Sequence, residues 1–135
     1  MKKYIFSLIA VLALGLFYGC DQSDQASTDE IKIGVILGFT GPIESLTPTM
    51  ASSAELAMKE VSDSGLLLGG AKVSSVRADS TCVDAGAATS AAERLVTSDN
   101  VAAIMGADCS GVTTAIANNV AVPNGVTIIS PSATS

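Results

Sequence analysis

The sequence predicts an α/β fold, an open parallel sheet with helices on both faces. Three observations predict it. Short aliphatic runs recur along the chain, amphipathic segments separate them, and the two kinds alternate regularly from Glu30 onward. Parallel strands covered on both faces are aliphatic almost throughout, and each parallel pair needs a crossover connection that is usually a helix. The pattern β-α-β-α-β-α-β therefore indicates right-handed crossovers, for which we expect the strand order 2-1-3-4.

The four expected strands cover residues 31–37, 71–78, 101–105 and 125–129, and the first of them, IKIGVIL, is nearly continuous in aliphatic side chains. Three expected helices, at residues 49–65, 85–98 and 110–120, lie between the strands. We expect Gly65 to end the first helix and Asp84 to cap the second. The side chains expected to be buried recur at helical spacing: Met50, Ala54, Ala57 and Val61 in the first helix, Ala88, Ala91, Leu95 and Val96 in the second, and Val112, Ile116 and Val120 in the third.

Function is expected at the carboxyl ends of the strands, because open parallel sheets bind ligands there, where the strand order reverses. The loops after the first, third and fourth strands read GFTGPIES, GADCSGVT and SPSATS. They are rich in glycine and hydroxyl groups and carry no catalytic cluster. The chain has no histidine, which excludes the usual serine and cysteine triads and most zinc sites. We therefore expect a binding crevice without metal or cofactor.

The third expected helix opens at Ser110, directly after a buried strand. Its first N–H groups lack partners within the helix, and together with the helix dipole they suit a carboxylate or a phosphate. Ser110 adds a hydroxyl, and Gly111 lets a ligand approach the backbone closely. The alternative is that Ser110 caps its own helix.

The N-terminus predicts export. Lys2 and Lys3 precede an uncharged apolar run at residues 5–18, which is typical of a secretory signal and too short to span a bilayer comfortably. The run ends in LFYGC, which resembles a bacterial lipobox, so residues 1–19 form the signal peptide and Cys20 receives the lipid. An ordinary signal peptide cut nearby is the alternative. Residues 20–30 carry four acids and no base, and we expect a flexible tether between a membrane anchor and the folded part.

The net charge bears on which molecules the protein can bind, and the cysteine content bears on disulfide pairing. Because Lys2 and Lys3 lie in the signal, the mature chain keeps five bases against 13 acids, a net charge of −8. It has no basic patch and few aromatic residues, so nucleic acid is not an expected partner. With Cys20 assigned to the lipid, Cys82 and Cys109 remain, most simply as a disulfide in an oxidising compartment. Two free thiols are the alternative.

Five segments resemble the type I periplasmic binding proteins of ABC importers, the Leu/Ile/Val-binding protein family. They are IKIGVILGFTGP, DSTC, AERLV, IMGADCSGVT and IISPSATS, and they occur in the family's order and spacing within residues 31–135. The resemblance implies a partial N-terminal lobe of a non-enzymatic, two-lobed protein that closes on a solute by a hinge motion. It also implies an ABC permease as partner and a disulfide between Cys82 and Cys109.

The resemblance assigns roles to individual residues. The position of Ser110 holds a ligand carboxylate, and that of Ser132 offers a backbone carbonyl to the ligand ammonium. The position of Thr134 gives its hydroxyl to the ammonium and its amide to the carboxylate. Leu46 falls where some relatives place a tyrosine over the ligand, and Thr40 is a further candidate. The alternative for Ser132, Thr134 and Thr40 is turn chemistry.

An aliphatic or branched-chain amino acid, or a similar small solute such as an amide, is the expected ligand. Within the same fold, a sensory solute receptor is an alternative to an importer component. A second hypothesis is an α/β enzyme or a nucleotide-binding domain. The sequence argues against it, because it has no histidine, no G-x-G-x-x-G motif after the first strand and no P-loop lysine motif. Because the family's second lobe lies outside these 135 residues, we expect them to bind ligand weakly or not at all by themselves.

Overall fold

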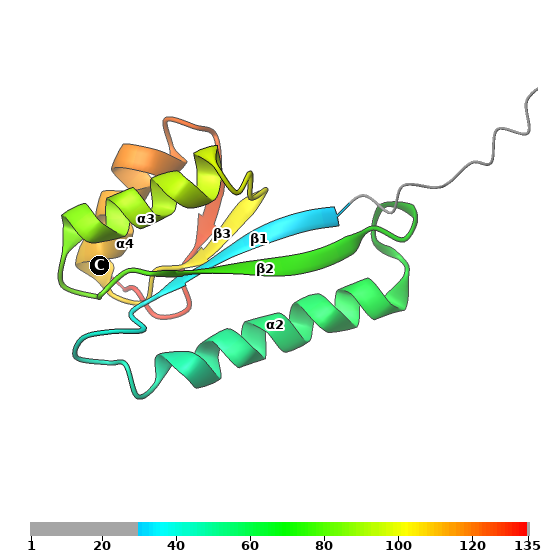
Figure 1. Ribbon diagram of the computed structural model, residues 1–135, viewed down its shortest axis with the longest axis horizontal. Helices are drawn as coiled ribbons and strands as arrows, with labels where there is room; N and C mark the ends of the chain where they lie inside the picture. Colours follow the sequence, from blue (N-terminus) through cyan, green and yellow to red (C-terminus); the bar gives the residue numbers. More distant parts are fainter. Residues whose placement is uncertain (1–29, 135) are drawn as a thin grey trace, which may run out of the picture.

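The sheet has four parallel strands in the order β2-β1-β3-β4, which confirms the predicted class and topology (Figure 1). The structure is a computed structural model, and it describes residues 30–134. The strands are β1 (Glu30–Leu37), β2 (Lys72–Asp79), β3 (Ala103–Gly106) and β4 (Thr127–Ile129). The expected signal peptide, Cys20 and all of the expected tether except Glu30 lie outside the described residues. Glu30 itself is the first residue of β1.

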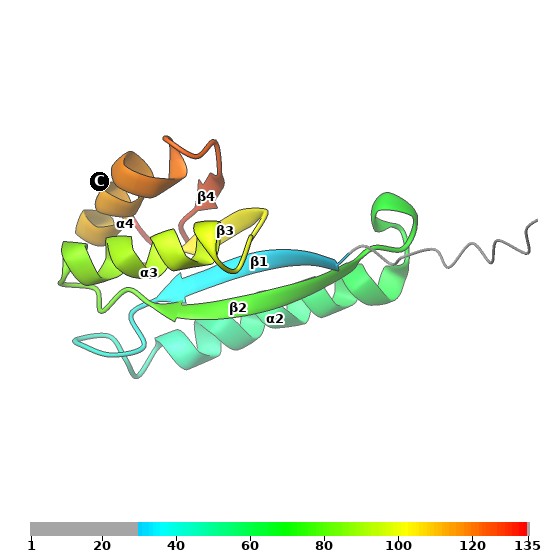
Figure 2. The same ribbon diagram turned by 45° about the horizontal axis from the view of Figure 1, so that its top comes forward.

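Helices cover both faces of the sheet. Helix α2 (Thr47–Ser64) lies on one face, and α3 (Ala85–Thr97) and α4 (Ser110–Ile116) lie on the other (Figures 1 and 2). Two short helical segments complete the connections, the 3-10 helix η2 (Leu67–Gly69) and the π-helical η3 (Ala117–Ala121), which continues α4 directly. Within residues 30–134, no helix is both long and apolar enough to cross a membrane.

Strands β3 and β4 each begin two residues later than predicted. The N–H of Val101 bonds to the carbonyl of Leu95, so this buried residue belongs to the turn after α3. The N–H of Val126 likewise bonds to the carbonyl of Ala121, and Gly125 has a φ of +64°, so both belong to the turn after η3. Both predicted strands were too long at their starts because they were placed by aliphatic residues. Such residues indicate burial, and they do not show whether the backbone pairs in the sheet.

The predicted buried face of α2 is wrong in part. The structure buries Thr47, Ala51 and Ser62, whereas Ala57 is exposed and Val61 is 42% exposed. Polar groups occupy this buried face because the neighbouring backbone satisfies them. The hydroxyl of Thr47 donates to the carbonyl of Gly38 (3.0 Å), and that of Ser62 accepts from the N–H of Val73 in β2 (2.7 Å).

The larger core lies between the sheet and α3 and α4. The stripe Val112, Ile116 and Val120 is buried as predicted, and it packs with Ala88, Ala92 and Leu95 of α3 and Ile36 of β1. Ala91 and Val96 are only partly buried. The end signals are confirmed: Asp84 accepts from the N–H of Ala87 (3.0 Å) at the start of α3, and Gly65 closes α2 with a φ of +66°.

Leu95 tests this core. It is fully buried, and Leu95→Ala should lower the free energy of unfolding by about 2–5 kcal/mol, because transfer free energy is lost and a cavity remains. Leu56→Ala removes the same atoms from a helix position that is 57% exposed, and it should change stability by less than about 1 kcal/mol. Urea denaturation of both variants gives the comparison, and equal losses would contradict this description of the core.

Candidate functional site

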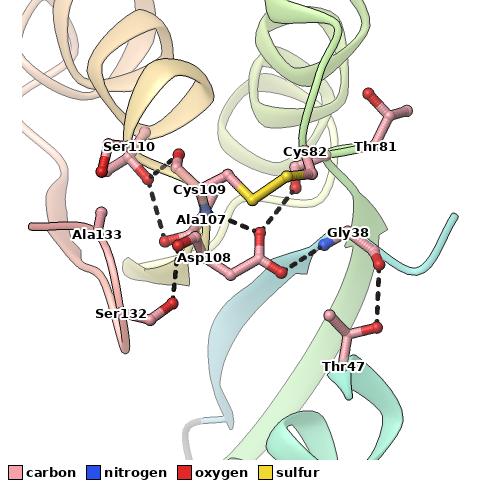
Figure 3. Close-up of a disulfide and its surroundings, with 12 residues drawn as sticks. Gly38, Thr47, Thr81, Cys82, Ala107, Asp108, Cys109, Ser110, Ser132 and Ala133 are labelled. Atoms are coloured by element: carbon pink, nitrogen blue, oxygen red, sulfur yellow. Dashed lines mark hydrogen bonds between the residues drawn. A yellow bond between two sulfur atoms is a disulfide. The ribbon is translucent and has the colours of Figure 1, made fainter. Parts of the chain in front are cut away.

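Four loops meet at the carboxyl ends of the strands. We call them the carboxyl-end loops: residues 38–46 after β1, 80–84 after β2, 107–109 after β3 and 130–134 after β4 (Figure 3). Hydrogen bonds connect each of them to at least one other. This is the edge of the sheet at which the sequence predicted a site.

Asp108 lies where these loops converge. Asp108 is buried, with only 5% of its surface exposed to solvent. One carboxylate oxygen, Oδ2, accepts from the N–H of Gly38 (2.9 Å), and the other, Oδ1, accepts from the N–H of Cys109 (3.1 Å) (Figure 3). The hydroxyl of Ser80 lies 3.4 Å from Oδ1. Gly38 is suited to this approach, because a Cβ there would lie 3.2 Å from the Cβ of Cys82. The loops after β1, β2 and β3 are thus held by one side chain.

The loop after β4 joins this group through three serines. Ser132 Oγ donates to the carbonyl of Asp108 (2.7 Å), and Ser130 Oγ donates to the carbonyl of Ala107. Ser130 Oγ also accepts from the N–H of Ala133 (2.8 Å), which closes a tight turn after Pro131. Ser110 Oγ accepts from the N–H of Thr134 (3.2 Å). The structure therefore brings Ser110, Ser132 and Thr134 to one place.

Ser110 does not cap α4. The N-cap residue is Cys109, which makes no side-chain capping bond, and Ser110 is the first residue of the helix. The alternative that Ser110 caps its own helix is therefore wrong. Its hydroxyl oxygen instead accepts a hydrogen bond from the N–H of Thr134 in the loop after β4. Turn chemistry is present in that loop, but Ser130 supplies it.

Thr40 and Leu46 lie apart from that group. The hydroxyl of Thr40 donates to Oδ2 of Asp79 (2.6 Å), and its N–H lies 3.3 Å from Oδ1. Thr40 therefore connects the loop after β1 to the end of β2. Leu46 is 61% exposed and precedes α2.

The environment of Asp79 favours its charged form. Partial burial opposes ionisation and by itself would raise the pKa of Asp79. Hydrogen bonds from the hydroxyl and N–H of Thr40 and from the N–H of Thr81 (2.8 Å) outweigh it, so the pKa of Asp79 lies below its ordinary value of 3.8.

Cys82 and Cys109 join two of the carboxyl-end loops. Their Sγ atoms are 2.03 Å apart and their Cα atoms 5.3 Å apart, so the structure has a disulfide between the loops after β2 and β3 (Figure 3). Thr81 and Cys82 have φ values of +56° and +69°, a conformation that non-glycine residues rarely adopt. The bond from Asp79 to the N–H of Thr81 and the disulfide hold this turn from its two ends.

Sequence reasoning missed three residues of this site, Asp79, Asp108 and Ser130. Each is a polar residue at or just after the end of a strand: Asp79 ends β2, Asp108 follows β3 and Ser130 follows β4. That position was a usable signal, because a polar side chain placed there falls at the carboxyl edge of the sheet. Their partners lie in other loops, and local pattern does not identify them.

The carboxyl-end loops are rich in groups that form hydrogen bonds. Hydroxyls, backbone N–H groups and three carboxylates, those of Glu44, Asp84 and Asp108, are present, and the chain has no histidine. Within residues 30–134, no group of three or more histidine, cysteine, aspartate or glutamate side chains is placed to hold a metal ion.

Comparison with known proteins gives the family. A family model described as periplasmic binding protein matches residues 30–135. The chain belongs to the periplasmic binding protein family. This confirms the resemblance carried by the five sequence segments.

Individual members of the family are similar to this chain in sequence and in fold. Leu/Ile/Val-binding protein homolog 7 of Brucella abortus is 35% identical over 112 residues, which is 82% of this chain and 25% of that protein. LivJ of Streptococcus pneumoniae, the substrate-binding protein of a branched-chain amino acid transporter, was solved with isoleucine. It superposes with a TM-score of 0.71 at 33% identity, over 79% of this chain and 30% of LivJ. The leucine-binding protein LivK of Thermotoga maritima gives 0.67 at 30% identity, over 78% and 28%. This chain thus spans about a quarter of the curated relatives it matches.

The lowered pKa of Asp79 predicts a pH-dependent contribution to stability. Because the folded-state value lies below the ordinary 3.8, charged Asp79 stabilises the fold at neutral pH, and this stabilisation is lost as the pH falls below 3.8. Asp79→Asn should therefore lower the melting temperature at pH 7, and the gap to the parent should shrink as the pH falls to 3. Asp84→Asn, at a helix cap that asparagine fills equally well, is the control. A gap that stays constant from pH 7 to 3 would refute the role given to Asp79.

Proposed function

We propose that this chain is the ligand-binding part of an extracytoplasmic solute-binding protein of an ABC importer, and that it binds an aliphatic amino acid. The observation that carries the proposal is the meeting of Ser110, Ser132 and Thr134 at the carboxyl-end loops of a periplasmic binding protein. The relatives support the ligand class. LivJ was solved with isoleucine, and LivK is described as a leucine-binding protein.

The carboxylate of the ligand is held by Ser110 and Thr134 in this proposal. Ser110 Oγ already accepts the N–H of Thr134, so its own proton is free to donate to a carboxylate oxygen. An arriving carboxylate can also accept directly from the N–H of Thr134. Hydrogen bonds to a charged group are about twice as strong as neutral ones.

The ammonium group of the ligand faces Ser132 and Thr134. Ser132 offers its carbonyl, the role that the family resemblance assigns to this position, while its hydroxyl donates to the carbonyl of Asp108. Thr134 offers its hydroxyl. A loop fixed by the turn at Ser130 thus presents acceptors for the ammonium beside the donors for the carboxylate.

No chemical step is part of the proposed function. The carboxylates of Asp79 and Asp108 accept hydrogen bonds from protein donors, and in this proposal they hold the loops in place. Residues 31–135 form part of a first lobe, and a second lobe closes over the ligand by a hinge motion. The permease receives the ligand from the closed protein.

The proposal includes export and anchoring. Residues 1–19 act as the signal peptide, Cys20 carries the lipid, and residues 20–30 tether the folded part to the outer face of the membrane. In that oxidising compartment the bond between Cys82 and Cys109 persists. In the loop-entropy model, closing a loop of 27 residues stabilises the fold by roughly 3–4 kcal/mol.

Ser110→Ala tests the binding site. In the protein encoded by the complete gene and started at Asp21, titration calorimetry with leucine, isoleucine and valine should show binding. The variant should weaken it about 10- to 100-fold, since a hydrogen bond to a charged group is lost. Ser53→Ala, an exposed hydroxyl on α2, should leave the affinity unchanged. If no amino acid binds the parent protein, the proposed ligand class is wrong, and if Ser110→Ala binds normally, the site is wrong.

Mass spectrometry of the exported protein tests its processing. The mature chain should begin at Cys20 and carry the mass of a lipid, and Cys20→Ser should abolish this modification. Iodoacetamide added before reduction should label neither Cys82 nor Cys109, and it should label both after reduction. A mature chain that begins elsewhere would contradict the lipid anchor, and labelling without reduction would contradict the disulfide.

A further inference from the structure

We propose that Asp108 is a positioning residue for the ligand: its buried carboxylate holds the loops after β1, β2 and β3, and its carbonyl holds the loop after β4, in the arrangement that recognises the ligand carboxylate. The inference rests on the proposed function and deepens it. Asp108 itself is not placed in contact with the ligand. It acts through Ser110, Ser132 and Gly38, with which it shares hydrogen bonds or the backbone.

The hydrogen-bond partners of Asp108 all lie in the carboxyl-end loops. Its side chain reaches Gly38 in the loop after β1 (2.9 Å), Ser80 at the end of β2 (3.4 Å) and the N–H of Cys109, the residue before Ser110 (3.1 Å). Its carbonyl accepts from Ser132 in the loop after β4 (2.7 Å). One residue therefore contacts every one of the carboxyl-end loops.

The carboxylate of Asp108 is stabilised by uncharged hydrogen-bond donors and not by a basic side chain. Among residues 30–134 the ion pairs are Lys59–Asp63, Arg77–Glu55 and Arg94–Asp99, and none of them includes Asp108. A buried carboxylate without a basic partner is costly unless its oxygens accept enough hydrogen bonds. Two backbone N–H groups and a more distant hydroxyl meet that need, and these groups stay in place only while the loops do.

An asparagine cannot reproduce the arrangement. Asp108 presents acceptors on both sides, Oδ2 to Gly38 and Oδ1 to Cys109. An asparagine side chain has one acceptor and one donating NH2 group. Whichever way the amide turns, either the N–H of Gly38 or that of Cys109 faces another donor, so one of the two loops must move.

The movement has a specific consequence at Ser110. Cys109 and Ser110 follow Asp108 directly, and Ser132 is bonded to its carbonyl, so a shift there separates the Ser110 hydroxyl from the N–H of Thr134. These are the groups assigned to the ligand carboxylate. A positioning role therefore predicts a loss of preference for a carboxylate over a carboxamide, whereas a purely structural role predicts lower stability with the preference unchanged.

The test compares leucine with leucinamide in the protein of the complete gene. We expect Asp108→Asn to reduce the ratio of the two affinities at least 10-fold at a temperature well below its melting point. Asp63→Asn, the same exchange at an exposed position of α2 outside the carboxyl-end loops, should leave the ratio unchanged. An unchanged ratio in a folded Asp108→Asn protein overturns the proposal.

Ser132→Ala provides a second variant in case Asp108→Asn does not fold. It keeps the carbonyl proposed for the ammonium and removes only the hydroxyl bond to Asp108 on an exposed loop. The ratio should fall about 2- to 5-fold, and no change in it would overturn the proposal.

Amide resonances separate the two proposals from each other. In ligand-free protein, Asp108→Asn or Ser132→Ala should shift the amide signals of Ser110 and Thr134, and Asp63→Asn on α2 should not. If these shifts occur but the parent binds no amino acid, the proposed function and the ligand assigned to it fail, while Asp108 still holds the loops. If the parent binds leucine and the shifts are absent, the positioning role fails alone.

Discussion

Hydrogen bonds from three different loops converge on the buried carboxylate of Asp108, and the arrangement of the carboxyl ends depends on them. The dependence is mutual. The charge stays buried only because the loops supply donors, and the loops keep their spacing because moving one of them leaves part of a charge without a partner. The neighbouring carbonyls of Ala107 and Asp108 extend the arrangement to the loop after β4. Polar satisfaction, more than apolar packing, therefore sets the geometry of this site.

The disulfide and Asp79 act on the same loops from the other side. The turn at Thr81 and Cys82 has a backbone conformation that is unfavourable for both residues, and covalent and hydrogen bonds on either side of it keep it in place. Asp79 also fixes Thr40, so the loop after β1 is attached both to Asp79 and to Asp108. Such attachment favours a site that is already formed before a ligand arrives, which reduces the entropy lost on binding.

Local pattern was enough to predict the class, the strand order and the two helix-end signals at Gly65 and Asp84. Each of these depends on residues close together in the sequence or on a general rule of parallel sheets. The buried face of α2 was not predictable in the same way. Thr47 and Ser62 are polar, and they are buried only because a loop carbonyl and an N–H of β2 happen to satisfy them. Asp108 was missed for a similar reason, since its partner Gly38 lies 70 residues away.

The position of β1 in the sheet has a consequence for how the chain acquires its fold. β1 is the first strand to be made, yet it pairs on both sides, Glu30 with Lys72 and Ile33 with Ala103, so its partners lie 42 and 70 residues further along. Pairing at such separations requires the closure of long loops before any contact is gained, and folding rates fall accordingly. β1 therefore stays unpaired on both sides until β2 is synthesised, and on its second side until β3 is synthesised. In the proposed exported protein, this delay favours a chain that is still unfolded when it crosses the membrane.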